Sequence, residues 1–250
     1  MTDAALRPLA DTSTGWTARK VVRSLGLREP SDSAPARPRV VAVMIASVDG
    51  RTAVKGRSVG LGHPADRALL RELRAAADVI LVGTGTLRAE RYANLLDDDQ
   101  RAQRVAAGLE PEPIVATVSR RLDLPHDIPL LAEPTARVQV YAEVEGEVPS
   151  QGAWVAVHRF EPGALTMPAI LEHLRTERGA RAILCEGGPT LLRELVVADC
   201  VDDVLLTIAP MLVAGGSPTL LCGPELEPPA GLALREIHRA DDHLFLHYTL

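Results

Sequence analysis

Residues 182–191 read Ala-Ile-Leu-Cys-Glu-Gly-Gly-Pro-Thr-Leu, an apolar run followed by two glycines and the start of a helix. Residues 79–86 repeat this design as Val-Ile-Leu-Val-Gly-Thr-Gly-Thr. A short apolar run that ends at a glycine turn is typical of a buried parallel strand, and the helix that follows covers the sheet. The two strand–turn–helix junctions therefore predict an α/β fold.

Outward from these junctions, apolar runs and helical patterns alternate along the chain. Strands are predicted at 40–45, 79–82, 114–118, 137–142, 154–158, 182–185 and 204–208, and helices at 63–77, 97–107, 167–177 and from 189 to about 197. Two final runs, 232–237 and 243–249, flank Asp241 and Asp242 and predict an antiparallel hairpin. We expect a mixed, mostly parallel sheet with helices on both faces.

The composition narrows the class of function. The chain has 250 residues and a net charge of −6, which excludes a strongly basic nucleic-acid-binding face at whole-chain level. Three cysteines without CxxC spacing predict neither a disulfide framework nor a zinc site, and they indicate a reducing cytoplasm. The histidines show no HxxxH or HExxH spacing, so no metal centre is expected. No apolar run reaches the ~20 residues of a membrane span.

Residues 1–38 differ from the rest, because Pro30, Pro35 and Pro38 lie among Ser, Ala and Arg. We expect a peripheral arm with a short helix near residues 16–25, docked through Trp16. Residues 39–250 are expected to form a single domain.

Each glycine junction can bind an anion, because a helix N-terminus offers free N–H groups and glycine lets a phosphate approach the backbone. Two such sites on one sheet favour a dinucleotide, or a phosphorylated substrate beside one. The alternative is that the glycines only turn the chain. Gly83-Thr84-Gly85 is not a Rossmann fingerprint, since Arg88 occupies the third glycine position.

Charged residues near the predicted strand ends are candidates for the rest of the site. Arg74 flanks the apolar stripe of its helix and can reach a pocket edge, and Arg120, in Ser119-Arg120-Arg121, suits the 2′-phosphate of NADPH. The carboxylates Asp49, Glu90 and Glu186 follow strands, where open α/β sheets bind ligands. The alternative is that these charged residues lie on solvent-exposed surfaces and loops and bind no ligand.

Three groups of motifs together resemble the reductase domain of riboflavin biosynthesis, a dihydrofolate-reductase-like family. They are Ser-Val-Asp-Gly-Arg-Thr-Ala at 47–53, Leu-Arg-Ala-Ala-Ala-Asp-Val-Ile-Leu-Val-Gly at 73–83 with Thr86, and Glu-Gly-Gly-Pro-Thr-Leu at 186–191 with Val-Asp-Asp at 201–203 and Ala-Pro at 209–210. The resemblance covers about residues 39–250. The zinc deaminase signature of the bifunctional members is missing, which implies the stand-alone form.

The resemblance implies a dihydrofolate-reductase-like fold, a homodimer, and NADPH-dependent reduction of a phosphorylated ribosylaminopyrimidine to its ribitylamino form. It places Ile45, Thr86, Ser119, Gly188 and the following Thr190 and Leu191 on NADPH, and Ser58, Arg74 and Glu186 on the substrate. To the cofactor set we add Gly83 and Gly187 from the glycine junctions, and Arg120. Glu90 stands where the family has Asp.

The segment 89–97, Ala-Glu-Arg-Tyr-Ala-Asn-Leu-Leu-Asp, lacks a proline and a substrate-binding arginine that the family has here. Substrate identity therefore stays open between the pyrimidine and a dihydropterin or dihydrofolate. A third alternative is a non-catalytic nucleotide-binding protein with the same fold.

Reduction of such a substrate needs protons as well as hydride, first to open the ribosylamine ring to an imine and then at nitrogen. A partly buried carboxyl group is a suitable donor. We take Asp49 and Glu90 as the candidate donors and Glu186 as an orienting group. The alternative for Asp49 is a turn-forming carboxylate that caps nearby N–H groups.

Overall fold

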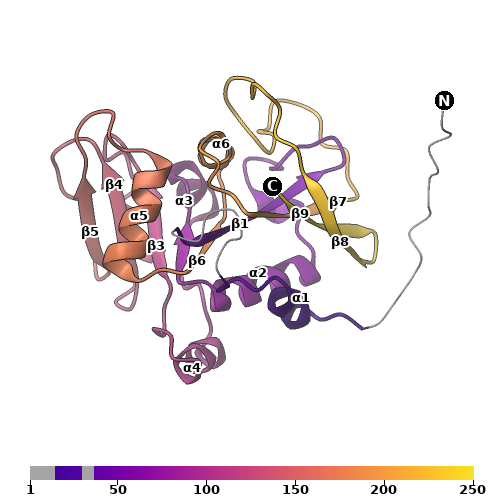
Figure 1. Ribbon diagram of the computed structural model, residues 1–250, viewed down its shortest axis with the longest axis horizontal. Coiled ribbons are helices and arrows are strands. Elements are labelled where there is room, and N and C mark those ends of the chain that lie inside the picture. Colours follow the sequence, from indigo (N-terminus) through magenta and orange to yellow (C-terminus); the bar gives the residue numbers. More distant parts are fainter. Residues whose placement is uncertain (1–14, 30–36) are drawn as a thin grey trace.

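The computed structural model describes residues 15–29 and 37–250, and this part of the chain is organised around a nine-stranded sheet (Figure 1). The sheet order is β5-β4-β3-β2-β6-β1-β7-β9-β8. The strands are β1 (Arg39–Ser47), β2 (Val79–Leu81), β3 (Ile114–Val118), β4 (Arg137–Ala142), β5 (Trp154–Arg159), β6 (Ala182–Cys185), β7 (Asp203–Ala209), β8 (Ala233–Ala240) and β9 (His243–Thr249). The first seven strands in this order, β5, β4, β3, β2, β6, β1 and β7, pair in parallel with their neighbours, and β9 pairs antiparallel with β7 and β8. The predicted mixed sheet and C-terminal hairpin are confirmed.

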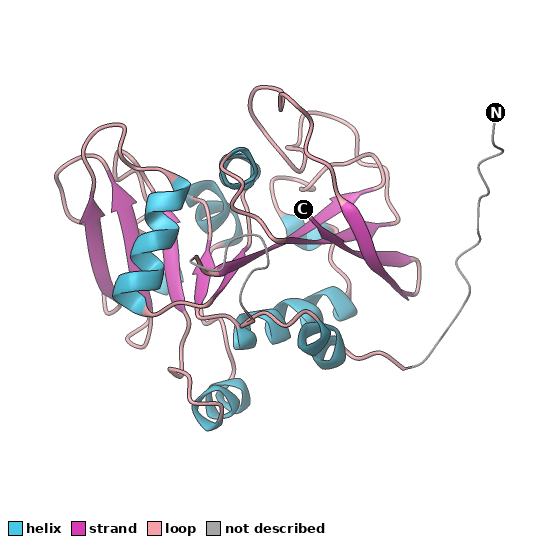
Figure 2. Cartoon of the chain, in the orientation of Figure 1, coloured by secondary structure: helices cyan, strands magenta, loops and turns pink. Residues whose placement is uncertain are grey.

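Helices cover both faces of the parallel part of the sheet, with α1 and α2 below it and α6 above it in Figure 2. The helices are α1 (Ala18–Ser24), α2 (Pro64–Ala76), α3 (Thr84–Glu90), α4 (Asp98–Ala106), α5 (Met167–Arg178) and α6 (Pro189–Val197), and short 3₁₀ turns span Ser58–Gly60 and Pro129–Ala132. Successive strand residues point to opposite faces. Val41 therefore packs in the core cluster with Leu73 of α2, and Val40 in the cluster with Leu174 of α5.

Helix α1 packs on this domain through Val22, and the residue that follows the helix, Leu25, is buried with it in the same core cluster as Leu69 and Leu73 of α2. Trp16 remains 47% exposed, with its ring centroid 5.1 Å from that of His238. Residues 1–14 and 30–36, the rest of the expected arm, lie outside the described residues, and the boundary at residue 38 stays a prediction. No helix in the described part of the chain is both long and apolar enough to cross a membrane.

Candidate active site

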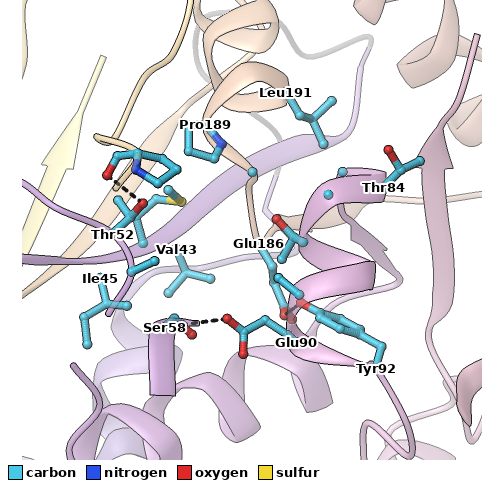
Figure 3. A pocket seen from close by; sticks show the side chains of 18 of the residues that line it. Val43, Ile45, Thr52, Ser58, Thr84, Glu90, Tyr92, Glu186, Pro189 and Leu191 are labelled. Carbon is cyan, nitrogen blue, oxygen red and sulfur yellow. Dashed lines mark hydrogen bonds between the residues drawn. The ribbon is translucent and has the colours of Figure 1, made fainter. Parts of the chain in front are cut away.

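A cavity of about 920 Å³ opens at the carboxyl ends of β1, β2, β3 and β6. Its lining includes Ile45 at the end of β1, Gly83 after β2, Val118 at the end of β3 and Glu186 after β6. Figure 3 shows Ser58, Glu90 and Tyr92 on one side, Pro189 and Leu191 on the other, and Glu186 between them. This is the edge at which open α/β sheets bind their ligands.

The two glycine junctions pack directly against each other beside this cavity. The Gly83 N–H donates to the Gly187 carbonyl at 2.7 Å, and the Glu186 N–H donates to the Leu81 carbonyl at 3.0 Å. A Cβ added at Gly83 would lie 3.0 Å from the Gly188 nitrogen, and one added at Gly188 would lie 2.9 Å from Thr86 Oγ1. A larger residue at either position would therefore crowd the contact between the two turns.

The helices that start from these turns lack the side-chain caps found at other helices. His63 caps α2, Asp97 caps α4 and Thr166 caps α5, whereas Gly83 before α3 and Gly188 before α6 make no side-chain cap bond. Free N–H groups at the start of the nine-residue α6 thus face the cavity, where Thr190 and Leu191 line it.

Gly85 leaves open space at the start of α3, because a Cβ added there would meet no atom within 4 Å. Gly85 also lines the cavity. The combination of uncapped N–H groups and open space fits a ligand phosphate that approaches the backbone.

A fixed charge pair lies in the cavity next to the second glycine junction. Arg74 Nε and Nη2 donate to the two carboxylate oxygens of Glu186 at 2.7 and 2.6 Å, and the Tyr92 hydroxyl donates to the same carboxylate. Burial by itself lowers the pKa of Arg74, but the Glu186 carboxylate outweighs it and the pKa is raised. Burial and the charge of Glu186 raise the pKa of Tyr92 well above its usual value. Arg74 and Glu186 therefore remain an ion pair, and the hydroxyl group of Tyr92 stays neutral.

A second carboxylate, Glu90, lies at the end of α3. Its Oε1 accepts the Ser58 N–H at 2.7 Å (Figure 3), and its Oε2 is 3.8 Å from Arg57 Nε. Ser58 and Glu90, far apart in the sequence, thus lie together on the cavity wall.

Arg120 lines the cavity beside α6, and its donors are partly engaged. Its Nη1 donates to Glu143 at 3.0 Å and to the Leu165 carbonyl at 2.8 Å, and its Nη2 lies 3.5 Å from Glu194. A ligand phosphate at Arg120 competes with these carboxylates.

Most of the predicted site residues meet in this one cavity. Those that line it are Ile45, Ser58, Arg74, Gly83, Thr86, Glu90, Arg120, Glu186, Gly188, Thr190 and Leu191. Gly187 stands just behind the lining and supplies the carbonyl that holds Gly83. Ser119 is buried away from the lining, where its N–H donates to the Tyr141 carbonyl at 2.9 Å.

Asp49 also lies outside the cavity lining, in the turn after β1. Its carboxylate accepts the Ser47 hydroxyl at 2.6 Å, the Val213 N–H at 3.0 Å and the Ala214 N–H at 2.7 Å. The bond from Ser47 and then the backbone bonds lower the pKa of Asp49 to about 2. This geometry fits the turn-forming interpretation, because a carboxyl with so low a pKa holds no proton to give near neutral pH.

Sequence reasoning missed Asp66, Tyr92 and Glu194, which also line the cavity. The sequence does contain a pattern that could have identified Asp66. It lies four and seven residues before Leu70 and Leu73, and this helical spacing puts it on the apolar face of α2. No sequence pattern identifies Tyr92 or Glu194, since each reaches the cavity through contacts with residues far away in the sequence.

The comparisons with known proteins agree with this geometry. The family model described as the RibD C-terminal domain matches residues 38–244. The chain is 28% identical over 192 residues to the 2,5-diamino-6-ribosylamino-4(3H)-pyrimidinone 5′-phosphate reductase of Archaeoglobus fulgidus, covering 75% of this chain and 87% of that protein.

It is also 31% identical over 180 residues to the riboflavin biosynthesis protein RibD of Mycobacterium tuberculosis, covering 71% of this chain and 44% of RibD. The chain therefore spans less than half of RibD. A pyrimidine reductase-like protein of Corynebacterium diphtheriae shares the fold, with a TM-score of 0.75, 24% identity and coverage of 94% of this chain and 98% of that one. With its family model covering residues 38–244 and this cavity at the expected sheet edge, the chain belongs to the RibD C-terminal domain family.

Proposed function

We propose that this chain is an NADPH-dependent reductase that converts a phosphorylated ribosylaminopyrimidine to its ribitylamino form. The observation that carries the proposal is that one cavity holds both the joined glycine junctions and the Arg74–Glu186 pair that extends from the second of them. Relatives named as pyrimidinone phosphate reductases support the substrate class.

The cofactor side rests on the uncapped start of α6 and the open space at Gly85. Gly188, Thr190 and Leu191 would hold the pyrophosphate through backbone contacts, and Thr86 would contact it from α3. Ile45 would lie against the nicotinamide. When bound, the reduced nicotinamide supplies the hydride.

The substrate side rests on groups that are already oriented. Glu186 is held by Arg74 and Tyr92, and Glu90 is held by the Ser58 N–H, so neither carboxylate needs to reorganise to accept bonds from substrate hydroxyl or amino groups. These residues position the opened ribosylamine chain, while the apolar Val43 and Leu70 exclude water from the same cavity.

The preference for NADPH rests on Arg120. Its guanidinium lines the cavity at the side of α6, where it can bind a 2′-phosphate, although Glu143 and Glu194 already share its donors.

The test is to follow NADPH oxidation with three substrates in parallel, the aminated ribosylaminopyrimidine phosphate, its deaminated counterpart and dihydrofolate. We expect turnover with at least one pyrimidine and none with dihydrofolate. Turnover with dihydrofolate alone would establish the pterin alternative. NADPH binding without turnover of any of the three would support the non-catalytic one.

We also propose that the chain forms a homodimer through the C-terminal hairpin. β8 is an edge strand, exposed Leu232 and Leu234 lie at its start, and every residue of β9 is only half-buried. A second copy that packs across the face of this hairpin and along β8 would cover both features. Sedimentation of the wild type should give twice the chain mass, and Leu234→Lys should lower it. A monomeric wild type would contradict the proposal.

A further inference from the structure

We propose that Asp66, held by Thr207 at the Ile45 side of the cavity, is the proton donor of the reduction. The inference rests on the proposed function and adds to it a residue that the sequence analysis did not include.

Asp66 reaches the cavity because of where α2 crosses the sheet. Thr207 of β7 is the register partner of Ile45 in β1, and its Oγ1 donates to Asp66 Oδ1 at 2.7 Å. Asp66 and Ile45 therefore stand over the same point of the β1–β7 pair, and both line the cavity. The Thr207 bond fixes one carboxyl oxygen, and no hydrogen bond to the other is found in the part of the chain that the structure describes.

The other acids of the cavity each face a guanidinium. Glu186 is 2.6 Å from Arg74, Glu90 is 3.8 Å from Arg57, and Glu194 is 3.5 Å from Arg120. A carboxylate beside a permanent cation gives up a stabilising interaction when it takes a proton. These three groups already face cations and are suited to hold hydroxyl and amino groups of a ligand.

Asp66 has different surroundings. Within residues 15–29 and 37–250 it makes no ion pair, and the charged or titratable groups that face it are His243 of β9, Arg67 of α2 and His63, the N-cap of α2. The hydrogen bonds found for the two histidines are to groups other than Asp66. His63 Nδ1 accepts the Ala65 N–H and its Nε2 donates to Asp241, and His243 Nε2 donates to the Leu61 carbonyl. Burial raises the pKa of Asp66, and the Thr207 bond and these neighbours offset only part of that rise.

In the proposed reduction the atoms and electrons balance as follows. Hydride supplied by NADPH adds to C1′ of the open-chain imine, the electron pair of the C=N bond moves to nitrogen, and nitrogen takes the proton of the Asp66 carboxyl. The C=N bond becomes a single bond, the substrate gains one C–H and one N–H bond, NADPH becomes NADP⁺, and Asp66 is left as a carboxylate. Solvent returns its proton before the next turnover.

The experiment uses Asp66→Asn, with Asp242→Asn in the exposed β8–β9 turn as the matched control. Asparagine keeps the shape and can accept the Thr207 bond, so the fold should survive. We expect Asp66→Asn to lower kcat by ~10²-fold or more, the usual contribution of a general acid, and to change the Kd of NADPH by less than about threefold. Asp242→Asn should behave as wild type.

A second readout needs no turnover. Infrared difference spectra of the free protein near neutral pH, wild type minus Asp66→Asn, should contain the carbonyl band of a protonated carboxylic acid. The kcat of the wild type should also fall as pH rises through the pKa of Asp66, because the donor loses its proton.

Absence of the carboxylic acid band, or a kcat of Asp66→Asn close to that of the wild type, would overturn the inference. Failure of the proposed function gives a different result, since the wild type itself would then reduce neither pyrimidine. The infrared band would remain measurable in that case. Thr207→Val should move the fall in kcat to higher pH, because the Thr207 bond lowers the pKa of Asp66, whereas Asp66→Asn should lose this pH dependence altogether.

Discussion

The two glycine junctions follow the same pattern in the sequence and meet different physical demands. At Gly83 and Gly188 an added Cβ would run into the other junction, at 3.0 and 2.9 Å, whereas at Gly85 it would meet nothing. The second junction also carries Glu186, whose carboxylate holds Arg74, and the first has no counterpart of it. Glycines that look alike in the sequence thus have different roles: Gly83 and Gly188 allow the two turns to pack closely, whereas Gly85 leaves open space.

The largest effect should come from the charge that distinguishes the second junction. Glu186→Gln leaves the guanidinium of Arg74 buried without its carboxylate, which should lower the free energy of unfolding by about 3 kcal/mol. Urea unfolding measures the loss. Arg74→Met combined with Glu186→Met should recover part of it, since no buried charge is then left alone. A double variant as unstable as Glu186→Gln would show that the pair is not the cause.

The next largest effect on stability is expected from a variant that disturbs the contact between the two junctions. Gly188→Ala places its Cβ against Thr86 Oγ1 and should cost about 2 kcal/mol of stability, the scale of an overpacked contact. Thr86→Ala removes the opposing atom, so the double variant should regain most of that stability. If Gly188→Ala unfolds at the same urea concentration as the wild type, the two turns are not as tightly joined as the distances indicate.

A smaller effect, on binding alone, is expected at the open glycine. Gly85→Val puts a side chain into the cavity and should weaken NADPH binding at least ~10-fold, about 1.4 kcal/mol, with unfolding changed by less than about 0.5 kcal/mol. Gly231→Val is the matched control, since Gly231 also has no neighbour within 4 Å but lies outside the cavity lining. Normal NADPH affinity in Gly85→Val would place the cofactor elsewhere.

The smallest effect concerns the 2′-phosphate. Arg120→Ala should weaken NADPH binding by about 1 kcal/mol and leave NADH binding nearly unchanged, the low end for a charge-assisted bond because two carboxylates already share this guanidinium. Calorimetric titration with both nucleotides measures the difference. Equal losses for the two would mean that Arg120 does not read the phosphate.

The fold was predictable because its signals are local. Strands such as 114–118 and 137–142 are apolar and β-branched runs whose ends agree with β3 and β4, and the turn residues Asp241 and Asp242 mark the hairpin. The two junctions were predictable for the same reason, since each is contained in fewer than ten residues.

The charge network of the site was harder to foresee because it depends on contacts across the fold. Arg74 and Glu186 are 112 residues apart, and Asp66 and Thr207 are 141 apart. Asp49 follows a strand, as site residues do, but its carboxylate accepts the Val213 and Ala214 N–H groups, so position at a strand end does not by itself reveal the role of a carboxylate. Only the partners of a carboxyl group reveal whether it carries a proton, and those partners come from other elements.

The turn from Glu186 to Gly188 has a consequence for how the two ligands influence each other. One end of this turn faces the proposed substrate and the other end faces the proposed cofactor, and the first junction holds its middle through Gly83. Either ligand that restrains the turn removes freedom that the other would otherwise have to remove, so each should bind more tightly in the presence of the other. Thermodynamic linkage makes the two enhancements equal. Cooperative binding would then follow from a three-residue segment shared by both sites, without any domain movement.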